Sequence, residues 1–203
     1  MEERPEHVHH PIESSNRRRP IASASAVAAS HAGPDAHGSP QHAHVLPDTL
    51  SALLWAGFGI NRPDKGGRMA PSAHNWQEID IYAVLAEGAY RYDARAHRLL
   101  LVKAEDLRQH TGTQNFVATA LVNLVYVADF VRMSEAQDDE RGFLAGADAG
   151  CIAQNIYLYC AGSGLATVVR GLIDRRRLTH ALGLTATQCI ALAQTLGYPG
   201  PEA

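Results

Sequence analysis

The side chains best suited to bind a small molecule lie in one short stretch, residues 71–77. Ser72 offers a hydroxyl group, and Asn75 and Gln77 offer side-chain amides that can both donate and accept hydrogen bonds. Pro71 and nearby glycines shape the backbone around them. This set of groups suits a planar heterocycle that carries both amide donors and carbonyl acceptors. An ordinary surface loop has a similar composition and is the alternative.

Three segments of the sequence, taken in order, resemble the nitroreductase family. They are residues 60–63 (INRP), residues 70–77 (APSAHNWQ) and residues 162–171 (GSGLATVVRG). The resemblance extends from about residue 46 to residue 199. It implies an α+β fold in which a mixed sheet is flanked by helices, and an intertwined homodimer.

The same resemblance implies an FMN-dependent oxidoreductase that is oxidised and reduced in turn. NADH or NADPH would donate electrons, and a nitroaromatic or quinone-like acceptor would receive them by ping-pong hydride transfer. Because the flavin carries this chemistry, no catalytic acid, base or nucleophile is expected from the protein. The acceptor and the choice between the two nicotinamides remain open.

The resemblance also implies which residues contact the cofactor. The backbone N–H groups of Arg170 and Gly171 would lie near flavin N5 and O4, where fixed donors stabilise the reduced ring. Gln114 would face the pyrimidine edge; an exposed helix residue is the alternative. We expect the loop and the Arg170 segment to fold together into one slot, with the sites at the interface of the homodimer. The complete expected set is Pro71, Ser72, Ala73, Asn75, Gln77, Gln114, Gly164, Leu165, Arg170 and Gly171.

The sequence departs from the family at the site for the cofactor phosphate. Nitroreductases usually carry Arg-x-Ser-x-Arg on the first helix, and the corresponding candidate here is residues 17–20 (RRRP), which matches poorly. Losing such charge-assisted contacts weakens phosphate binding. Two alternatives to an enzyme therefore remain: a non-catalytic flavin-binding or storage protein, and a structural dimer that has lost its ligand.

Composition excludes several other partners. The chain has 203 residues, 46% of them hydrophobic, and a net charge of -3, which offers no positive patch for nucleic acid or an anionic membrane. We expect a cytoplasmic protein without a membrane span, and no metal site. The cysteines at 151, 160 and 189 lie in apolar stretches and are predicted to be reduced core residues.

The elements expected to position the site begin after a polar tail. Residues 1–44 are rich in His, Ala, Ser and Pro and are expected to be disordered, so the flavin-binding domain would cover residues 45–203. Helices are predicted from Asp48 as N-cap, weakly over 105–118, from 143 to 161, and from Asp174 to Gly183. The long third helix should be buried on most sides, which a subunit interface would explain. Strands are predicted at 79–85, 89–93, 97–103, 120–128, 165–169 and 189–196.

Overall fold

The computed structural model describes residues 47–199. Residues 1–44, including the arginines at 17–19, lie outside the described part, so the predictions about them are not addressed. The described α-helices are α2 (Pro47–Phe58), α3 (Asp138–Ser163) and α4 (Arg175–Leu182). The strands are β1 (Ile60–Arg62), β2 (Gly67–Arg68), β3 (Ile79–Leu85), β4 (Gly88–Asp93), β5 (Arg98–Lys103), β6 (Val122–Asp129), β7 (Ala166–Arg170) and β8 (Gln188–Gly197).

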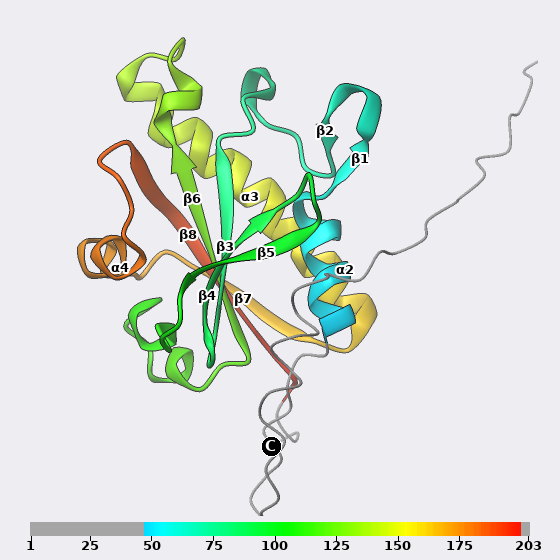
Figure 1. The fold of residues 1–203 in the computed structure, drawn as a ribbon, viewed down its shortest axis with the longest axis vertical. Helices are drawn as coiled ribbons and strands as arrows, with labels where there is room; N and C mark the ends of the chain where they lie inside the picture. Colours follow the sequence, from blue (N-terminus) through cyan, green and yellow to red (C-terminus); the bar gives the residue numbers. More distant parts are fainter. Residues whose placement is uncertain (1–46, 200–203) are drawn as a thin grey trace, which may run out of the picture.

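Six strands form one sheet in the order β5-β4-β3-β6-β8-β7, and each neighbouring pair is antiparallel. Strands β1 and β2 form a separate short hairpin. Helices α2 and α3 lie side by side against one face of the sheet, and α4 lies on the other (Figure 1). The predicted α+β fold is confirmed, but the six-stranded sheet is antiparallel where a mixed sheet was expected.

The central strand β6 explains why residues 121–127 are apolar without interruption except at Asn123. Leu124 and Tyr126 join the core beneath α2 and α3, whereas Val125 and Val127 join the core beneath α4. Both faces of β6 are therefore buried, which removes the usual alternation of apolar and polar residues. The sheet thus separates two cores.

Helices α2 and α3 approach closely at Gly57. A Cβ atom at this position would lie 2.6 Å from Cδ1 of Ile156, which is fully buried in α3. Helix α2 begins at Pro47, so Asp48 lies in its first turn instead of forming the predicted N-cap. Proline at this position is typical because its missing N–H would have no helical partner.

Helix α3 differs from the prediction in length and in burial. It begins at Asp138, where three acidic residues in the first turn suit the positive end of the helix dipole. It is buried on only one side: Phe143 is 77% exposed and Leu158 is 64% exposed. The single chain therefore does not bury this helix on most sides and leaves an apolar stripe on its outer surface, so burial by a subunit interface stays a prediction.

The structure also tests the predictions for residues 105–118, for the start of α4 and for the three cysteines. Residues 105–118 form two short 3-10 helices, η3 (Arg108–His110) and η4 (Asn115–Ala118), in place of the expected weak helix. Asp174 caps α4 by accepting from the N–H of Arg177, as predicted.

Cys160 is buried, but Cys189 is exposed and Cys151 is half-buried, so the assignment of all three cysteines to the core is wrong. Among residues 47–199 we find no helix long and apolar enough to cross a membrane.

Candidate cofactor site

The loop of residues 71–77 has an unusual backbone. His74, Asn75 and Gln77 have φ angles of 49°, 57° and 51°, in the left-handed region that glycine normally occupies. Each such residue costs on the order of 1 kcal/mol and persists only where surrounding contacts enforce it. The loop is therefore held in one particular shape.

Gln77 is the centre of the contacts that enforce this shape. Its amide nitrogen donates to the carbonyl of Gly66 and to Oδ1 of Asn75, each at 3.0 Å, and its Oε1 accepts from Nε of Arg68 at 2.9 Å. Its backbone N–H donates to Oγ of Ser72 at 3.0 Å. Both amide donors of Gln77 are thus used inside the loop region, which gives this predicted flavin contact a structural role.

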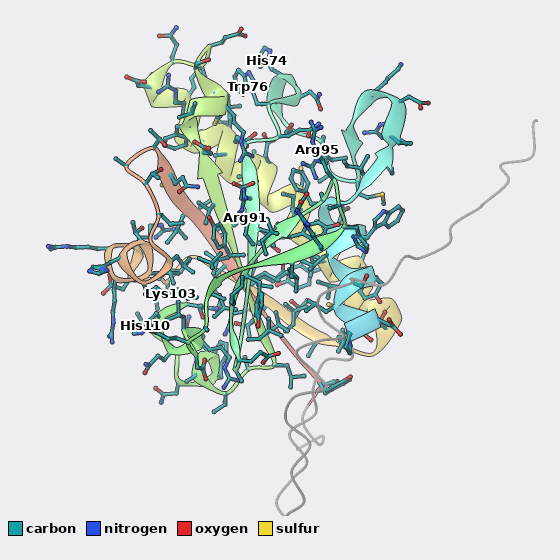
Figure 2. All side chains as sticks on the ribbon, viewed as in Figure 1. His74, Trp76, Arg91, Arg95, Lys103 and His110 are labelled. Atoms are coloured by element: carbon teal, nitrogen blue, oxygen red, sulfur yellow. The ribbon has the colours of Figure 1, made fainter. Side chains whose placement is uncertain are left out.

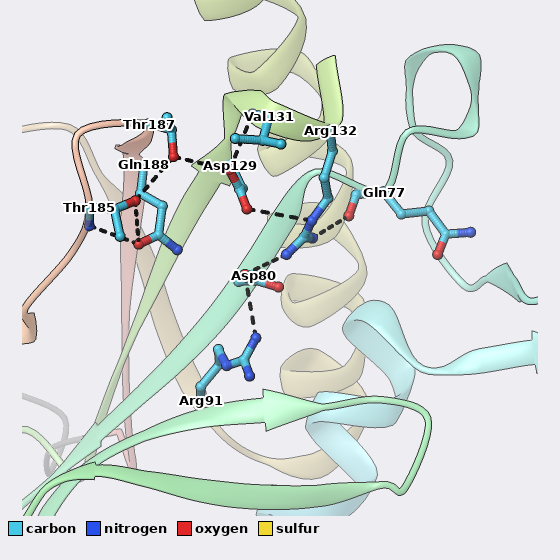
Figure 3. Close-up of polar contacts among 9 residues, drawn as sticks. All are labelled: Gln77, Asp80, Arg91, Asp129, Val131, Arg132, Thr185, Thr187 and Gln188. Carbon is cyan, nitrogen blue, oxygen red and sulfur yellow. Dashed lines mark hydrogen bonds and ion pairs between the residues drawn. The ribbon is translucent and has the colours of Figure 1, made fainter. Parts of the chain in front are cut away.

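Arg132 fixes the point where the loop enters strand β3 (Figure 3). Its Nη1 donates to the carbonyl of Gln77 and its Nη2 to Oδ2 of Asp80, both at 2.8 Å. Asp80 also pairs with Arg91 at 3.8 Å, and Nε of Arg132 lies 3.8 Å from Asp129. The loop is therefore tied to two strands and to the 3-10 helix η5 (Phe130–Met133) that carries Arg132.

The loop presents a small polar surface outward. Pro71 and Asn75 are exposed, and Ser72 and Ala73 are half-buried. In the part of the chain that the structure describes, the Ser72 hydroxyl proton and the Asn75 amide N–H groups have no partner, so they remain available as donors. His74 stacks on Trp76 with ring centroids 4.6 Å apart. These groups can contact one side of a planar ligand.

A second set of polar groups surrounds Arg170, at the end of β7. The side chain is 5% exposed, and its guanidinium donates to Oγ1 of Thr195 and the carbonyl of Thr111, each at 2.9 Å, and to Oδ1 of Asn123 at 3.2 Å. Sequence reasoning missed these three partners. Asn123 could have been found, because it is a polar residue inside an apolar strand and buried polar groups need partners.

The charge of Arg170 has no carboxylate to balance it within residues 47–199. Burial lowers the pKa of its guanidinium. The guanidinium also lies over the ring of Phe116, 5.9 Å from its centroid. A buried cation held by neutral groups costs several kcal/mol, so this region favours an anion or a ligand that gains negative charge.

Gln114 lies beside Arg170, because both approach Gly112. A Cβ atom on Gly112 would lie 2.8 Å from Oε1 of Gln114 and would collide with Nη1 of Arg170. This Oε1 is buried and has no hydrogen-bond partner among the described residues. An acceptor in this state fits a ligand that brings an N–H group, as the pyrimidine edge of a flavin does.

The remaining predicted contacts are distributed unevenly. Gly171 follows Arg170 directly, and no atom lies within 4 Å of where its Cβ would be, so its backbone is accessible. Gly164 and Leu165 lie at the opposite end of β7, where Gly164 caps α3 with φ 68° and Leu165 is buried in the core. The structure does not bring these two residues to Arg170.

Within one chain the loop and the Arg170 segment do not form one slot, so the slot expected at the homodimer interface stays a prediction. Strands β6 and β8 separate β3, which follows the loop, from β7, a distance of about 14 Å across three strand spacings. Ala73 is held by Asp148 of α3, whereas Arg170 joins Asn123 and Thr195 on the α4 side. In Figure 2, His74 and Trp76 of the loop and His110 of η3 lie at opposite ends of the molecule.

Comparison with known proteins identifies the family to which this chain belongs. Residues 41–198 match the model of the nitroreductase family. The chain belongs to the nitroreductase family. Among solved structures, it is similar to one described as a nitroreductase of Ralstonia eutropha JMP134, with 38% identity, a TM-score of 0.75, and coverage of 84% of this chain and 88% of that one.

Two further relatives of this nitroreductase-family chain are more distant. A protein of Methanocaldococcus jannaschii named as a nitroreductase is 29% identical over 133 residues, which are 60% of this chain and 66% of that protein. The chain therefore spans just under two thirds of that relative. The NADPH:FMN oxidoreductase of Vibrio harveyi, solved with NAD+, shares the fold with a TM-score of 0.58 at 21% identity, over 83% of this chain and 66% of that one.

Proposed function

We propose that this chain is an FMN-dependent oxidoreductase that uses NADH or NADPH to reduce nitroaromatic or quinone-like acceptors. The observation that carries the proposal is that the buried, unpartnered Oε1 of Gln114 lies beside the buried guanidinium of Arg170, which no carboxylate among the described residues balances. Bound FMN would supply the hydride transfer in both half-reactions. Membership of the nitroreductase family and the resemblance to an NADPH:FMN oxidoreductase support this choice.

In this proposal, each part of the site has a separate task. Gln114 binds the pyrimidine edge through its amide, which can both donate and accept. The guanidinium of Arg170 stabilises negative charge nearby, and the N–H of Gly171 is accessible to the ring. Pro71, Ser72 and Asn75 pack and donate from the other side of the ligand.

We infer that the two parts meet across the interface of a homodimer. The loop of one protomer would face Gln114 and Arg170 of its partner, which explains why one chain separates them. The exposed apolar stripe of α3, with Phe143 and Leu158, offers the surface for this association. Burying it in the dimer would also account for the apolar composition of that helix.

Subunit mixing tests this arrangement directly. One protein would carry Asn75→Ala in the loop and the other Gln114→Ala, and each is expected to bind FMN poorly. Co-expression restores about a quarter of the sites if random pairing gives hybrid dimers in which one site has both intact parts. If a hybrid with one substitution in each chain regains no FMN, the two parts belong to the same subunit or do not bind flavin.

The visible spectrum of the purified protein tests the function itself. A yellow protein whose flavin is bleached by NADH or NADPH under nitrogen, and recovers with a quinone, is expected. A colourless protein that takes up no added FMN would contradict the proposal. Size-exclusion chromatography with light scattering measures the expected dimer independently.

A second candidate is a flavin-binding or storage protein without turnover. It is favoured by the poor match of residues 17–20 to the phosphate-binding motif of the family. This candidate predicts a yellow protein whose flavin is not reduced by either nicotinamide.

A further inference from the structure

Glu78, which lies between the 71–77 loop and strand β3, has a fully buried carboxyl group. Its exposure is 0%, and neither Oε1 nor Oε2 has a conventional donor among the described residues. An ionised carboxylate in such a place is strongly unfavourable. Burial therefore favours the protonated form of the Glu78 carboxyl group.

Asp148 of α3 is the acid that faces Glu78. Burial, and then the charge and hydrogen bonding of Asp148, raise the pKa of Glu78 to about 7. Two neighbouring buried carboxyl groups interact favourably when one of them is protonated and can donate to the other. Asp148 is itself 8% exposed, and its Oδ2 accepts from the backbone N–H of Ala73 at 2.8 Å.

We propose that Glu78 and Asp148 share one proton, and that this shared proton holds the 71–77 loop in its left-handed conformation. With the proton present, Glu78 donates to Asp148, and Asp148 keeps Oδ2 for Ala73. Without it, two negative charges meet in a buried place, and one side chain must turn away. If Asp148 turns, Ala73 loses its acceptor and the strained loop relaxes. Both acids are thus positioning residues.

The other charged groups near this pair do not replace the proton. Arg132, from η5, lowers the pKa of Glu78, but its guanidinium is already engaged by Gln77, Asp80 and Asp129. His74, in the loop, is exposed and its ring stacks on that of Trp76.

The consequence for the ligand rests on the proposed function. The loop carries Pro71, Ser72 and Asn75, so FMN should bind more tightly when the pair is protonated. Since one proton is involved, the dissociation constant should rise by up to about tenfold per pH unit above neutral pH. By the same linkage, the binding of each FMN at pH 8 should be accompanied by the uptake of less than one proton on average.

The shared proton can be tested on the full chain without any flavin. The carbon-13 shift of the Glu78 carboxyl should titrate near neutral pH in the wild type, which needs no substitution. Hydrogen exchange of the Ala73 amide, corrected for its intrinsic pH dependence, should lose about tenfold in protection or more between pH 6 and pH 8. Glu78→Gln, whose amide donates to Asp148 at every pH, should abolish this loss.

The controls distinguish the pair from its neighbours. Glu140→Gln changes an exposed acid of α3 and should leave the Ala73 titration unchanged. If the loss of protection persists in Glu78→Gln, His74 or another group causes it, and the proposal is wrong. A carboxyl shift of Glu78 that titrates near pH 4.5 would also overturn it.

The pH dependence of FMN binding separately tests whether the shared proton affects the affinity for the ligand. Its dissociation constant in the wild type should rise from pH 6 to pH 8, and that of Glu78→Gln should stay constant within about twofold. A pH-independent affinity in the wild type, together with the expected Ala73 titration, would remove the link to FMN. If no FMN binds at any pH, the proposed function fails, while the carboxyl shift still decides whether the proton is shared.

Discussion

The guanidinium of Arg170 donates from Nη2 to Oδ1 of Asn123 at 3.2 Å and so joins the edge strand β7 to the central strand β6. The bond passes over β8, whose Thr195 takes part in the same network. The Thr195 hydroxyl accepts from Nε of Arg170 at 2.9 Å and donates to Oδ1 of Asn123 at 2.6 Å. A buried cation on β7 is thus held by neutral groups from two strands, β6 and β8, and from the turn at Thr111.

Removing the hydroxyl at the centre of this network should destabilise the protein. Thr195→Val keeps the shape of the side chain but leaves Nε of Arg170 without its acceptor. We expect a loss of about 1–3 kcal/mol in the free energy of unfolding, measured in urea. Thr113→Val, at an exposed position, is the matched control and should change this free energy by less than about 0.5 kcal/mol. Equal effects of the two would contradict the importance of the network.

The close packing of α2 on α3 predicts opposite effects of two glycine substitutions. Gly57→Ala places a methyl group 2.6 Å from Cδ1 of buried Ile156 and should cost about 1–3 kcal/mol. Gly142→Ala, in α3, meets no atom within 4 Å and should be neutral or stabilise the helix by up to about 1 kcal/mol. Thermal unfolding by circular dichroism compares them. A stable Gly57→Ala protein would mean that the two helices can move apart without cost.

Charges on the outer stripe of α3 should prevent association. Phe143→Glu and Leu158→Glu each place a charge where we expect the homodimer interface, so light scattering should show monomers. Leu101→Glu, on the 60% exposed Leu101 of edge strand β5, is the control and should leave the dimer intact. If sites form between subunits, the monomeric variants should also lose FMN. Dimers that persist in both α3 variants would place the interface elsewhere.

The raised pKa of Glu78 predicts how the free energy of unfolding depends on pH. Its pKa is about 7 in the folded protein and 4.5 in the unfolded chain. Between these values the folded state binds more protons, so the free energy of unfolding falls as pH rises, by roughly 1–3 kcal/mol, and this contribution is constant above pH 7. Glu78→Gln should lack this decrease and be the more stable of the two at pH 8. Parallel stability curves for the two proteins, from urea unfolding at several pH values, would contradict the shifted pKa.

The sequence by itself determined most of the strands and helices, but the ends of only some of them. Apolar alternation predicted β3, the turn at residues 87–88 predicted β4 and β5 as a continuing meander, and the apolar run broken at Asn123 predicted a central β6. Asp174 and Gly183 marked the ends of α4 correctly, because capping depends on a few neighbouring residues. The segments resembling the nitroreductase family also lie in the chain region that matches its model.

Only the tertiary structure decided which of these residues lie together. Strand order places β6 and β8 between the two expected halves of the slot, and sequence spacing carries no information on that order. The same holds for Glu78 and Asp148, and for Arg170 with Asn123 and Thr195, whose contacts join residues distant in the chain. Local patterns record the preferences of neighbouring residues, whereas burial and charge depend on partners that folding alone supplies.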